Sequence, residues 1–187
     1  MKALLIIDMQ IGSFKPATPR FNTDILIYKI NKLAAAIREN GNKVIFIQHD
    51  GSKENNFIPD SSDWEILSSL IKDPEDLIIN KTANDPFYES DLQDTLDKFG
   101  IKELVITGCA TEYCVDTSVR SALSKDFKVI VVKDGHTTAD RPHLKAEKVI
   151  EHHNWIWENM TPTKGNVAVV EFEKVIEEFK RENKRTS

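Results

Sequence analysis

The sequence has few of the residues that would mark a specialised class of protein. Its 187 residues include only two cysteines, too few for a disulfide framework, so we expect a reduced, cytoplasmic protein whose thiols are available for chemistry. No apolar run approaches the roughly 20 residues that a membrane span needs, and the apolar stretch at the N-terminus stops at Asp8, too early for a signal peptide. Positive charge is not in excess, since 25 lysines and arginines face 30 aspartates and glutamates. We therefore expect neither a membrane nor a nucleic acid as a partner.

The residues that are present have the balance of an ordinary globular protein. The chain is 40% hydrophobic and 29% charged, and its length allows one full hydrophobic core. We find no internal repeat and no low-complexity linker. We therefore expect residues 1–187 to form a single domain, with the charged tail 180–187 frayed.

Apolar runs alternate along the chain with stretches of helical periodicity. We expect strands at 2–8, 43–50, 75–81, 102–108, 127–135 and 166–170, and helices at 22–41, 90–100, 111–126, 141–160 and 171–183, with Pro142 in the first turn of the fourth helix. The expected strands are apolar on both faces, which is typical of a parallel sheet covered by helices on both sides. With right-handed crossovers, the prediction is a doubly wound, three-layer α/β sandwich around a six-stranded parallel sheet.

Three reactive side chains follow the ends of expected strands. Asp8 ends the first strand, Lys81 ends the third, and Cys114 lies just past the fourth. Long irregular segments at 9–21, 50–63, 82–89 and 134–141 follow the same ends of the strands, and open α/β sheets bind ligands at that edge. Because a parallel sheet brings these ends together, we expect the three side chains to share one site.

Each of the three has a catalytic and a structural interpretation. Cys114 lies in the first turn of an expected helix whose N-cap is Thr111, where the helix end lowers the pKa of a thiol, although a buried structural cysteine is the commoner case. Asp8 is suited to a general base, but it could also cap a turn or bind a metal. Lys81 is either a partner of Asp8 or a solvated loop cation.

If the three side chains meet, a reaction follows from their chemistry. Asp8 takes the thiol proton, and Cys114 attacks a carbonyl carbon to form a thioester that water then cleaves. Lys81 offsets the charge of Asp8. Backbone N–H groups at the start of the helix stabilise the oxyanion.

Four segments of the sequence resemble the isochorismatase-like cysteine hydrolases, the group that includes nicotinamidases. They are LLIIDMQ (4–10), VIFIQHD (44–50), the stretch 79–123, which contains ITGCATEYCV, and KVIVVKDGHTT (128–138). The resemblance implies a catalytic triad of Asp8, Lys81 and Cys114. It also implies a cis peptide bond between Cys109 and Ala110, which turns the Ala110 N–H toward the oxyanion beside the N–H of Cys114. Family habit further suggests a homodimer or homotetramer.

The metal ligands of metal-dependent nicotinamidases are incomplete in this sequence. Those enzymes carry an Asp-x-His pair after the second strand and a further His downstream. Asp50 fits the first ligand, but Ser52 stands where the His is expected, and segment 53–80 has no histidine. We therefore expect no metal and no other cofactor, which also weakens nicotinamide as the substrate. His49 has either a structural role or a place in the site lining.

The substrate pocket is predicted from residues on loops and helix starts at the same edge. The aromatic candidates are Phe14, Phe57, Trp64, Phe87 and Tyr113, which either form an apolar pocket or pack within their own loops. Gln10, two residues after Asp8, is expected to hydrogen-bond the substrate or hold Asp8. We assign His136, which follows the fifth strand, to the rim.

The leading functional prediction is a cysteine-dependent hydrolase that cleaves a small, non-peptide amide through a thioester acyl-enzyme. One alternative is hydrolysis of a vinyl ether, as by an isochorismatase; some family members do this with another residue in place of the cysteine, so Cys114 favours the amide. A second is a non-catalytic binding or redox protein on the same scaffold. A redox pair of Cys109 and Cys114 is disfavoured, because C-x4-C is not the spacing of the usual dithiol motif.

Overall fold

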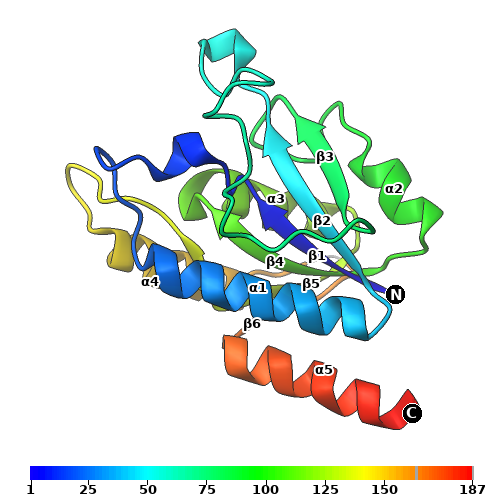
Figure 1. The fold of residues 1–187 in the computed structure, drawn as a ribbon. Helices are drawn as coiled ribbons and strands as arrows, with labels where there is room; N and C mark the ends of the chain where they lie inside the picture. Colours follow the sequence, from blue (N-terminus) through cyan, green and yellow to red (C-terminus); the bar gives the residue numbers. More distant parts are fainter. Residues whose placement is uncertain (163, 187) are drawn as a thin grey trace.

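Six parallel strands form the centre of the protein. The computed structural model describes residues 1–162 and 164–186, with side chains as far as Asn183 (Figure 1). The strands are β1 (Lys2–Ile7), β2 (Lys43–His49), β3 (Leu77–Lys81), β4 (Glu103–Cys109), β5 (Lys128–Thr137) and β6 (Val167–Val170). They are ordered β3-β2-β1-β4-β5-β6, and each neighbouring pair is parallel. The predicted six-stranded, doubly wound sheet is confirmed.

Helices cover both faces of this sheet. They are α1 (Thr23–Glu39), α2 (Leu92–Lys98), α3 (Asp116–Ser124), α4 (Ala146–Glu158) and α5 (Phe172–Thr186). Side chains of α1 and α5 share one hydrophobic core, and those of α2, α3 and α4 share the other, so the two groups lie on opposite faces (Figure 1). None of the helices in the described part of the chain is long and apolar enough to cross a membrane.

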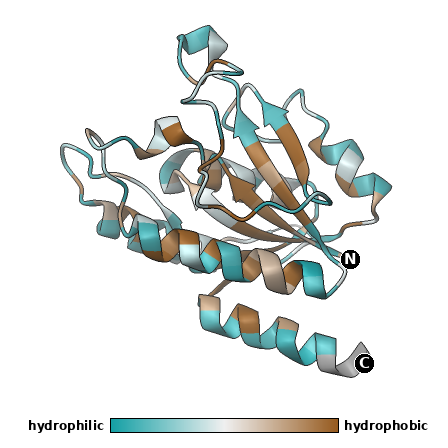
Figure 2. Cartoon of the chain, viewed as in Figure 1, coloured by the Kyte–Doolittle hydropathy of each residue, from teal (hydrophilic) through white to brown (hydrophobic). Residues whose placement is uncertain are grey.

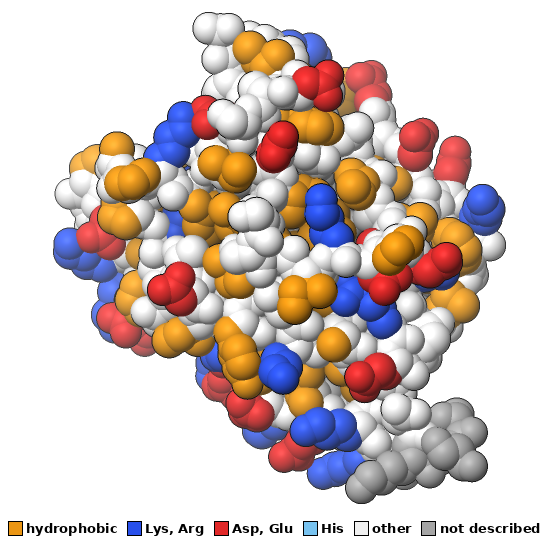
Figure 3. All heavy atoms as spheres, in the orientation of Figure 1, with side chains coloured by type: hydrophobic (Ala, Val, Ile, Leu, Met, Phe, Trp, Pro, Cys, Tyr) orange, Lys and Arg blue, Asp and Glu red, His pale blue; other side chains and the backbone are white. Residues whose placement is uncertain are grey.

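The pattern of burial follows the two-residue period of a strand. In β1, Leu4 and Ile6 belong to the core beneath α1 and α5, whereas Ala3, Leu5 and Ile7 belong to the core on the other face. Figure 2 shows the strands as largely hydrophobic, while α1 and α5 alternate between hydrophobic and hydrophilic residues. On the surface seen in Figure 3, charges of both signs are interspersed, with no broad area of one sign.

The start of the fourth helix differs from the prediction. The helix α4 begins at Ala146 rather than at 141, so Pro142 is not in its first turn. Residues 141–144 form a small turn instead, in which the Arg141 N–H donates to the Leu144 carbonyl, and the Asp140 carboxylate accepts the Ala146 N–H at 2.9 Å. A side-chain acceptor of this kind satisfies the free N–H groups at a helix start.

The C-terminal helix is longer than expected. We expected a helix at 171–183, whereas α5 runs to Thr186; residue 187 lies outside the described part, and fraying of the tail 180–187 stays a prediction. The contacts of α5 include the pair of Arg181 with Glu177 one turn away and the Lys2 ammonium, which lies 2.9 Å from the carboxylates of both Glu178 and Glu182.

The ends of the central strands are level, and this places the candidate site. Ile7 is aligned with Ile47 of β2 and with Gly108 of β4, and His49 of β2 is aligned with Lys81 of β3. Gly108 has a φ of +121°, and a Cβ atom there would lie 2.2 Å from the Ile7 carbonyl oxygen. Only glycine allows the two chains to approach so closely at this point.

Candidate active site

Asp8, Lys81 and Cys114 are in contact at the carboxyl edge of the sheet. The Lys81 Nζ lies 2.9 Å from Asp8 Oδ2 and 3.4 Å from Cys114 Sγ. A third bond runs from Nζ to the Ala83 carbonyl at 2.9 Å. These three partners use all three N–H donors of the ammonium, so its position is fully determined by the protein.

The sheet order explains why a long side chain is needed at position 81. Asp8 directly follows β1, with a left-handed backbone (φ 48°) and its N–H bonded to the Ile47 carbonyl at 2.9 Å. Lys81 is the last residue of β3, and β2 lies between these strands. Since neighbouring strands are about 4.8 Å apart, the lysine must span roughly two strand spacings to reach Asp8.

Cys114 lies in a short π-helical segment, η3 (Thr111–Val115), between β4 and α3. The Ala110 carbonyl accepts the N–H groups of Tyr113 and Val115, on either side of the cysteine, and the Cys109–Ala110 peptide bond is cis, as the resemblance implied. The expected N-cap is wrong, because the Thr111 hydroxyl bonds His136 Nδ1 at 2.9 Å instead of a backbone N–H.

The pKa of the Cys114 thiol is raised, contrary to the sequence-based expectation that the helix start lowers it. Burial raises the pKa of Cys114, and the nearby Asp8 carboxylate raises it further, while Lys81 acts in the opposite direction. For Lys81, burial is the largest single influence and lowers the pKa, but the attraction of Asp8 and Cys114 and the hydrogen bonds to both together outweigh it, so the pKa is raised. Asp8 Oδ1 is buried and has no hydrogen-bond partner among the described residues. This oxygen is therefore available to accept a proton.

His136 is buried against Thr111 and Asn154 and is not among the residues that line the cavity, so it does not lie on the rim where we placed it. The ring is buried, and burial lowers its pKa to about 4. The Asn154 amide donates to the Lys133 carbonyl, so its oxygen faces His136 Nε2 at 3.0 Å and this nitrogen carries the proton. The other ring nitrogen accepts the Thr111 hydroxyl, so His136 connects β5 and α4 to the start of the Cys114 segment.

A cavity of about 190 Å³ opens beside the three side chains. Its lining includes predicted and unpredicted residues: Asp8, Gln10, Ser13, Arg20, His49, Phe57, Asn84, Cys109, Ala110, Tyr113 and Cys114. Ser13, Arg20 and Asn84 were not expected. Asn84 Oδ1 lies 3.4 Å from the Cys114 sulfur, and its position just after the third strand is the one sequence signal that could have indicated it.

Gln10 and Tyr113 line this cavity, but in different ways. The Gln10 amide is fully used, because Nε2 donates to the carbonyls of His49 and Trp64 at 3.0 and 2.9 Å and Oε1 accepts the His49 N–H at 2.8 Å. This amide links the end of β2 to the following loop. It does not bond Asp8, and none of these bonds is directed at the cavity. Tyr113 is 50% exposed and stands at the mouth.

Three of the predicted aromatic residues do not line the cavity. Phe87 is buried against Phe127, with ring centroids 5.8 Å apart, and Phe14 packs against the core beneath α1. Trp64 contributes its backbone carbonyl, which accepts from the amides of Gln10 and Gln48. These rings are used to bury their own loops, which is the alternative interpretation of an aromatic residue in a long loop.

The second cysteine has surroundings that make it unreactive. Cys109 is the last residue of β4, it is free and only 1% exposed, and burial raises its pKa to about 12. A buried thiol with so little thiolate at neutral pH is a poor nucleophile. Between the two cysteines, the contacts of Cys114 with Lys81 and Asn84 distinguish it as the candidate nucleophile.

The residues considered as metal ligands have other partners or none. Asp50 Oδ1 accepts both the N–H and the hydroxyl of Ser52, at 2.9 and 2.5 Å. His49 is partly buried, burial lowers its pKa, and its Nδ1 has no partner in the described part of the chain. Among the described residues, no group of three or more His, Cys, Asp or Glu side chains is arranged to hold a metal ion.

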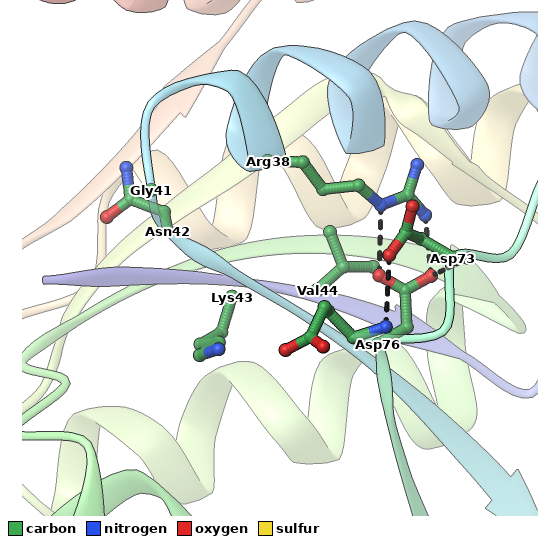
Figure 4. A pocket seen from close by; sticks show the side chains of 8 residues that line it. Arg38, Gly41, Asn42, Lys43, Val44, Asp73 and Asp76 are labelled. Atoms are coloured by element: carbon green, nitrogen blue, oxygen red, sulfur yellow. Dashed lines mark hydrogen bonds and ion pairs between the residues drawn. The ribbon is translucent and has the colours of Figure 1, made fainter.

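A second hollow lies at the opposite edge of the sheet, where β2 begins (Figure 4). Lys43, Val44 and Asp76 are among the residues that line it. Arg38 reaches across it and is held by Asp76, with Nε–Oδ1 and Nη2–Oδ2 distances of 2.9 and 2.6 Å. Arg38 and Asp76 neutralise each other there, and the hollow contains no cysteine, so the cavity beside Cys114 is the candidate active site.

Comparisons with known proteins agree with this geometry. The family model described as "Isochorismatase domain" matches residues 2–177. The chain is 29% identical over 142 residues to a streptothricin hydrolase of Streptomyces noursei, covering 76% of this chain and 51% of that protein, so it spans about half the length of that relative. It is 26% identical over 151 residues to Nicotinamidase 3 of Arabidopsis thaliana, 73% of each chain. A crystal structure described as an isochorismatase family protein is 30% identical and superposes with a TM-score of 0.81, over 89% of this chain and 97% of that one.

Proposed function

Because the chain belongs to the isochorismatase family of hydrolases, we propose that it is a cysteine-dependent amidase that cleaves the C–N bond of a small, non-peptide amide. One observation carries the proposal: Cys114 Sγ and Asp8 Oδ2 lie 3.4 and 2.9 Å from the same buried ammonium, that of Lys81, beside a cavity of about 190 Å³. A thiol, a carboxylate and a fixed cation are the groups that acyl transfer through a thioester requires.

The first half of the reaction consumes the amide bond. Asp8 takes the proton from the Cys114 thiol, and the sulfur attacks the carbonyl carbon. Asp8 then gives the same proton to the amide nitrogen, and ammonia or an amine leaves. The enzyme is left with a thioester on Cys114 and an ionised Asp8.

The second half returns the enzyme to its starting state. Water attacks the thioester carbonyl while Asp8 takes a proton from it. The C–S bond breaks, the carboxylic acid is released, and Asp8 returns the proton to the Cys114 sulfur. The unpartnered Oδ1 of Asp8 supports its role as the group that accepts the proton in both halves.

Lys81 acts on the charge balance without touching the substrate. All three of its N–H donors are bonded to protein atoms, so none is left for a ligand. Its charge stabilises the thiolate that forms when Asp8 is protonated, and it keeps Asp8 within reach of the sulfur. We therefore assign Lys81 as a positioning and electrostatic residue.

The oxyanion is assigned to backbone N–H groups. Ala110 and Cys114 flank the turn that starts η3, and both line the cavity. Donors of this kind are fixed before the substrate arrives, and the loss of one typically costs about 3–4 kcal/mol of transition-state stabilisation. The homodimer or homotetramer and the cytoplasmic location stay predictions.

Steady-state assays on a panel of small carboxamides, with released ammonia as the readout, test the proposal. We expect turnover by the wild type and at least a thousandfold loss in Cys114→Ala and in Asp8→Asn, in line with the roughly 10³–10⁶-fold losses typical of nucleophile and base variants. The matched control is Lys102→Gln, because Lys102 is exposed and lies just before β4, at the opposite edge of the sheet. Activity that survives in both site variants would remove the triad from the mechanism.

A further inference from the structure

We propose that Arg20 binds an anionic group of the substrate, so that the amide hydrolysed here also carries a carboxylate. The inference rests on the proposed amidase function and adds a substrate class to it. Arg20 lines the cavity beside Cys114, and no described carboxylate lies within ion-pair distance of its guanidinium. A cation without a partner, in the wall of a reaction site, is suited to a ligand of opposite charge.

The pairing of the other arginines shows that Arg20 differs from them. Each of the other four whose side chains are described forms an ion pair: Arg38 with Asp76, Arg120 with Asp116, Arg141 with Glu112, and Arg181 with Glu177. In Arg20 only Nε has a protein partner, the Ser13 carbonyl at 2.6 Å. Both Nη atoms therefore remain available, and their N–H groups form the fork that matches the two oxygens of a carboxylate.

The backbone of Arg20 is held firmly beside the cavity. Arg20 forms an antiparallel bridge with Ala139. The next residue, Phe21, donates its N–H to the Thr138 carbonyl at 2.9 Å and accepts the Thr137 hydroxyl at 2.7 Å. The loop before α1 is thus fastened to the end of β5, and the bond from Nε to the Ser13 carbonyl holds the guanidinium itself, so little ordering is required when a ligand binds.

The charges around the cavity leave Arg20 uncompensated. The Asp8 carboxylate is balanced by Lys81, which lies beneath it. Glu112, near the same edge, is balanced by Arg141. Among the residues that line the cavity, Asp8 and Arg20 carry the formal charges, so the site has a net positive charge once the Asp8–Lys81 pair is counted. An anionic substrate is attracted to such a site, and a cationic one is repelled.

The size of the cavity limits the distance between the two groups of the substrate. At about 190 Å³, the cavity is smaller than the roughly 300–1,000 Å³ of pockets that hold drug-sized ligands. With the amide carbonyl at Cys114 and the carboxylate at Arg20, only a short linker fits between them. The monoamides of small dicarboxylic acids, such as succinamate, have this form.

Kinetics with a charged and a neutral amide of similar shape test the assignment. The pair is succinamate and 4-methylpentanamide, in which an isopropyl group replaces the carboxylate. For Arg20→Gln we expect kcat/KM to fall roughly 10- to 100-fold with succinamate, because a hydrogen-bonded charge pair is lost, and less than threefold with 4-methylpentanamide. Arg20→Lys should lie between, since it keeps the charge and loses the fork. Lys102→Gln removes one positive charge at the far edge of the sheet and should leave kcat/KM unchanged with both substrates.

Binding without turnover separates this inference from the proposed function. Succinamate is titrated by calorimetry into Cys114→Ala and into the double variant Cys114→Ala/Arg20→Gln. Weaker binding to the double variant by about tenfold or more supports the anion site, even if the wild type hydrolyses neither amide and the amidase proposal fails. Equal affinity of succinamate for the two variants, or equal losses for charged and neutral amides in the kinetic test, would overturn the role of Arg20 while leaving the amidase proposal intact.

Discussion

The buried ion pair of the site makes a strong prediction about stability. Lys81 is 1% exposed and Asp8 is 6% exposed, so Lys81→Met leaves a largely buried carboxylate without its counter-charge. Asp8 Oδ2 loses its partner at 2.9 Å, and Oδ1 has none in the described structure. Breaking one side of a buried pair costs about 3–5 kcal/mol, and methionine keeps most of the volume of the lysine stem.

The double variant Asp8→Asn/Lys81→Met tests whether this cost comes from charge. It removes both charges, so we expect its free energy of unfolding to exceed that of Lys81→Met by about 2–4 kcal/mol, although it carries one more substitution. Lys102→Met is the matched control: the Lys102 side chain is 76% exposed and lies 3.8 Å from Asp97, so its loss should cost less than about 0.5 kcal/mol.

Urea unfolding followed by tryptophan fluorescence and circular dichroism measures these differences by linear extrapolation. The slope should be the same for all variants, so that the midpoints can be compared. A Lys81→Met protein within 1 kcal/mol of the wild type would refute the reasoning, because it would mean that Asp8 is solvated or has another partner. A double variant as unstable as Lys81→Met would show that packing, not charge, sets the cost.

Three further predictions concern the fold and the site. Burial lowers the pKa of His136 to about 4, whereas in the unfolded chain it is near 6.5. As the pH falls below 6.5, the unfolded chain therefore takes up a proton at His136 that the folded protein does not. The free energy of unfolding falls as a result, by at most about 3 kcal/mol when the pH reaches 4. Urea unfolding between pH 7 and 4 should show the stability gap between wild type and His136→Gln narrowing, and a constant gap would contradict the assignment. Gly108→Ala should destabilise the protein by roughly 2–5 kcal/mol, because φ is +121° and the new Cβ would meet the Ile7 carbonyl; thermal melting checks this, and an unchanged Tm would show that the strands can separate. Incubation with EDTA should leave amidase activity unchanged, and a loss that zinc restores would show that a metal is required.

The sheet and the meeting of the three reactive side chains were predictable from the sequence. Apolar runs of strand length alternate with helical stretches, and a parallel sheet places all carboxyl ends at one edge. Asp8, Lys81 and Cys114 each follow such an end, so their proximity needs no knowledge of side-chain packing.

The electrostatics of the site could not be read from the chain. Proximity to a helix start favoured a lowered Cys114 pKa, but burial and the Asp8 carboxylate dominate and raise it. Both depend on distances between segments far apart in the sequence. The sequence also could not predict that the guanidinium of Arg20 lacks a carboxylate partner, since only the structure shows which arginines form ion pairs.

Loop side chains were the least predictable part. An aromatic residue in a long loop either faces a ligand or buries the loop, and the sequence does not distinguish these. Phe57 and Tyr113 line the cavity, whereas Phe87 packs on Phe127. The start of α4 depends in the same way on the Asp140 carboxylate, which accepts a backbone N–H six residues ahead.

The central claim is that Cys114 becomes covalently bonded to the acyl part of an amide substrate. Intact-protein mass spectrometry after acid quench of a running reaction tests this directly, with peptide mapping to locate the added mass. We predict one acyl group per chain, on Cys114, in the wild type and no added mass in Cys114→Ala. Turnover by Cys114→Ala at the wild-type rate, or an acyl group on any other residue, would contradict the account.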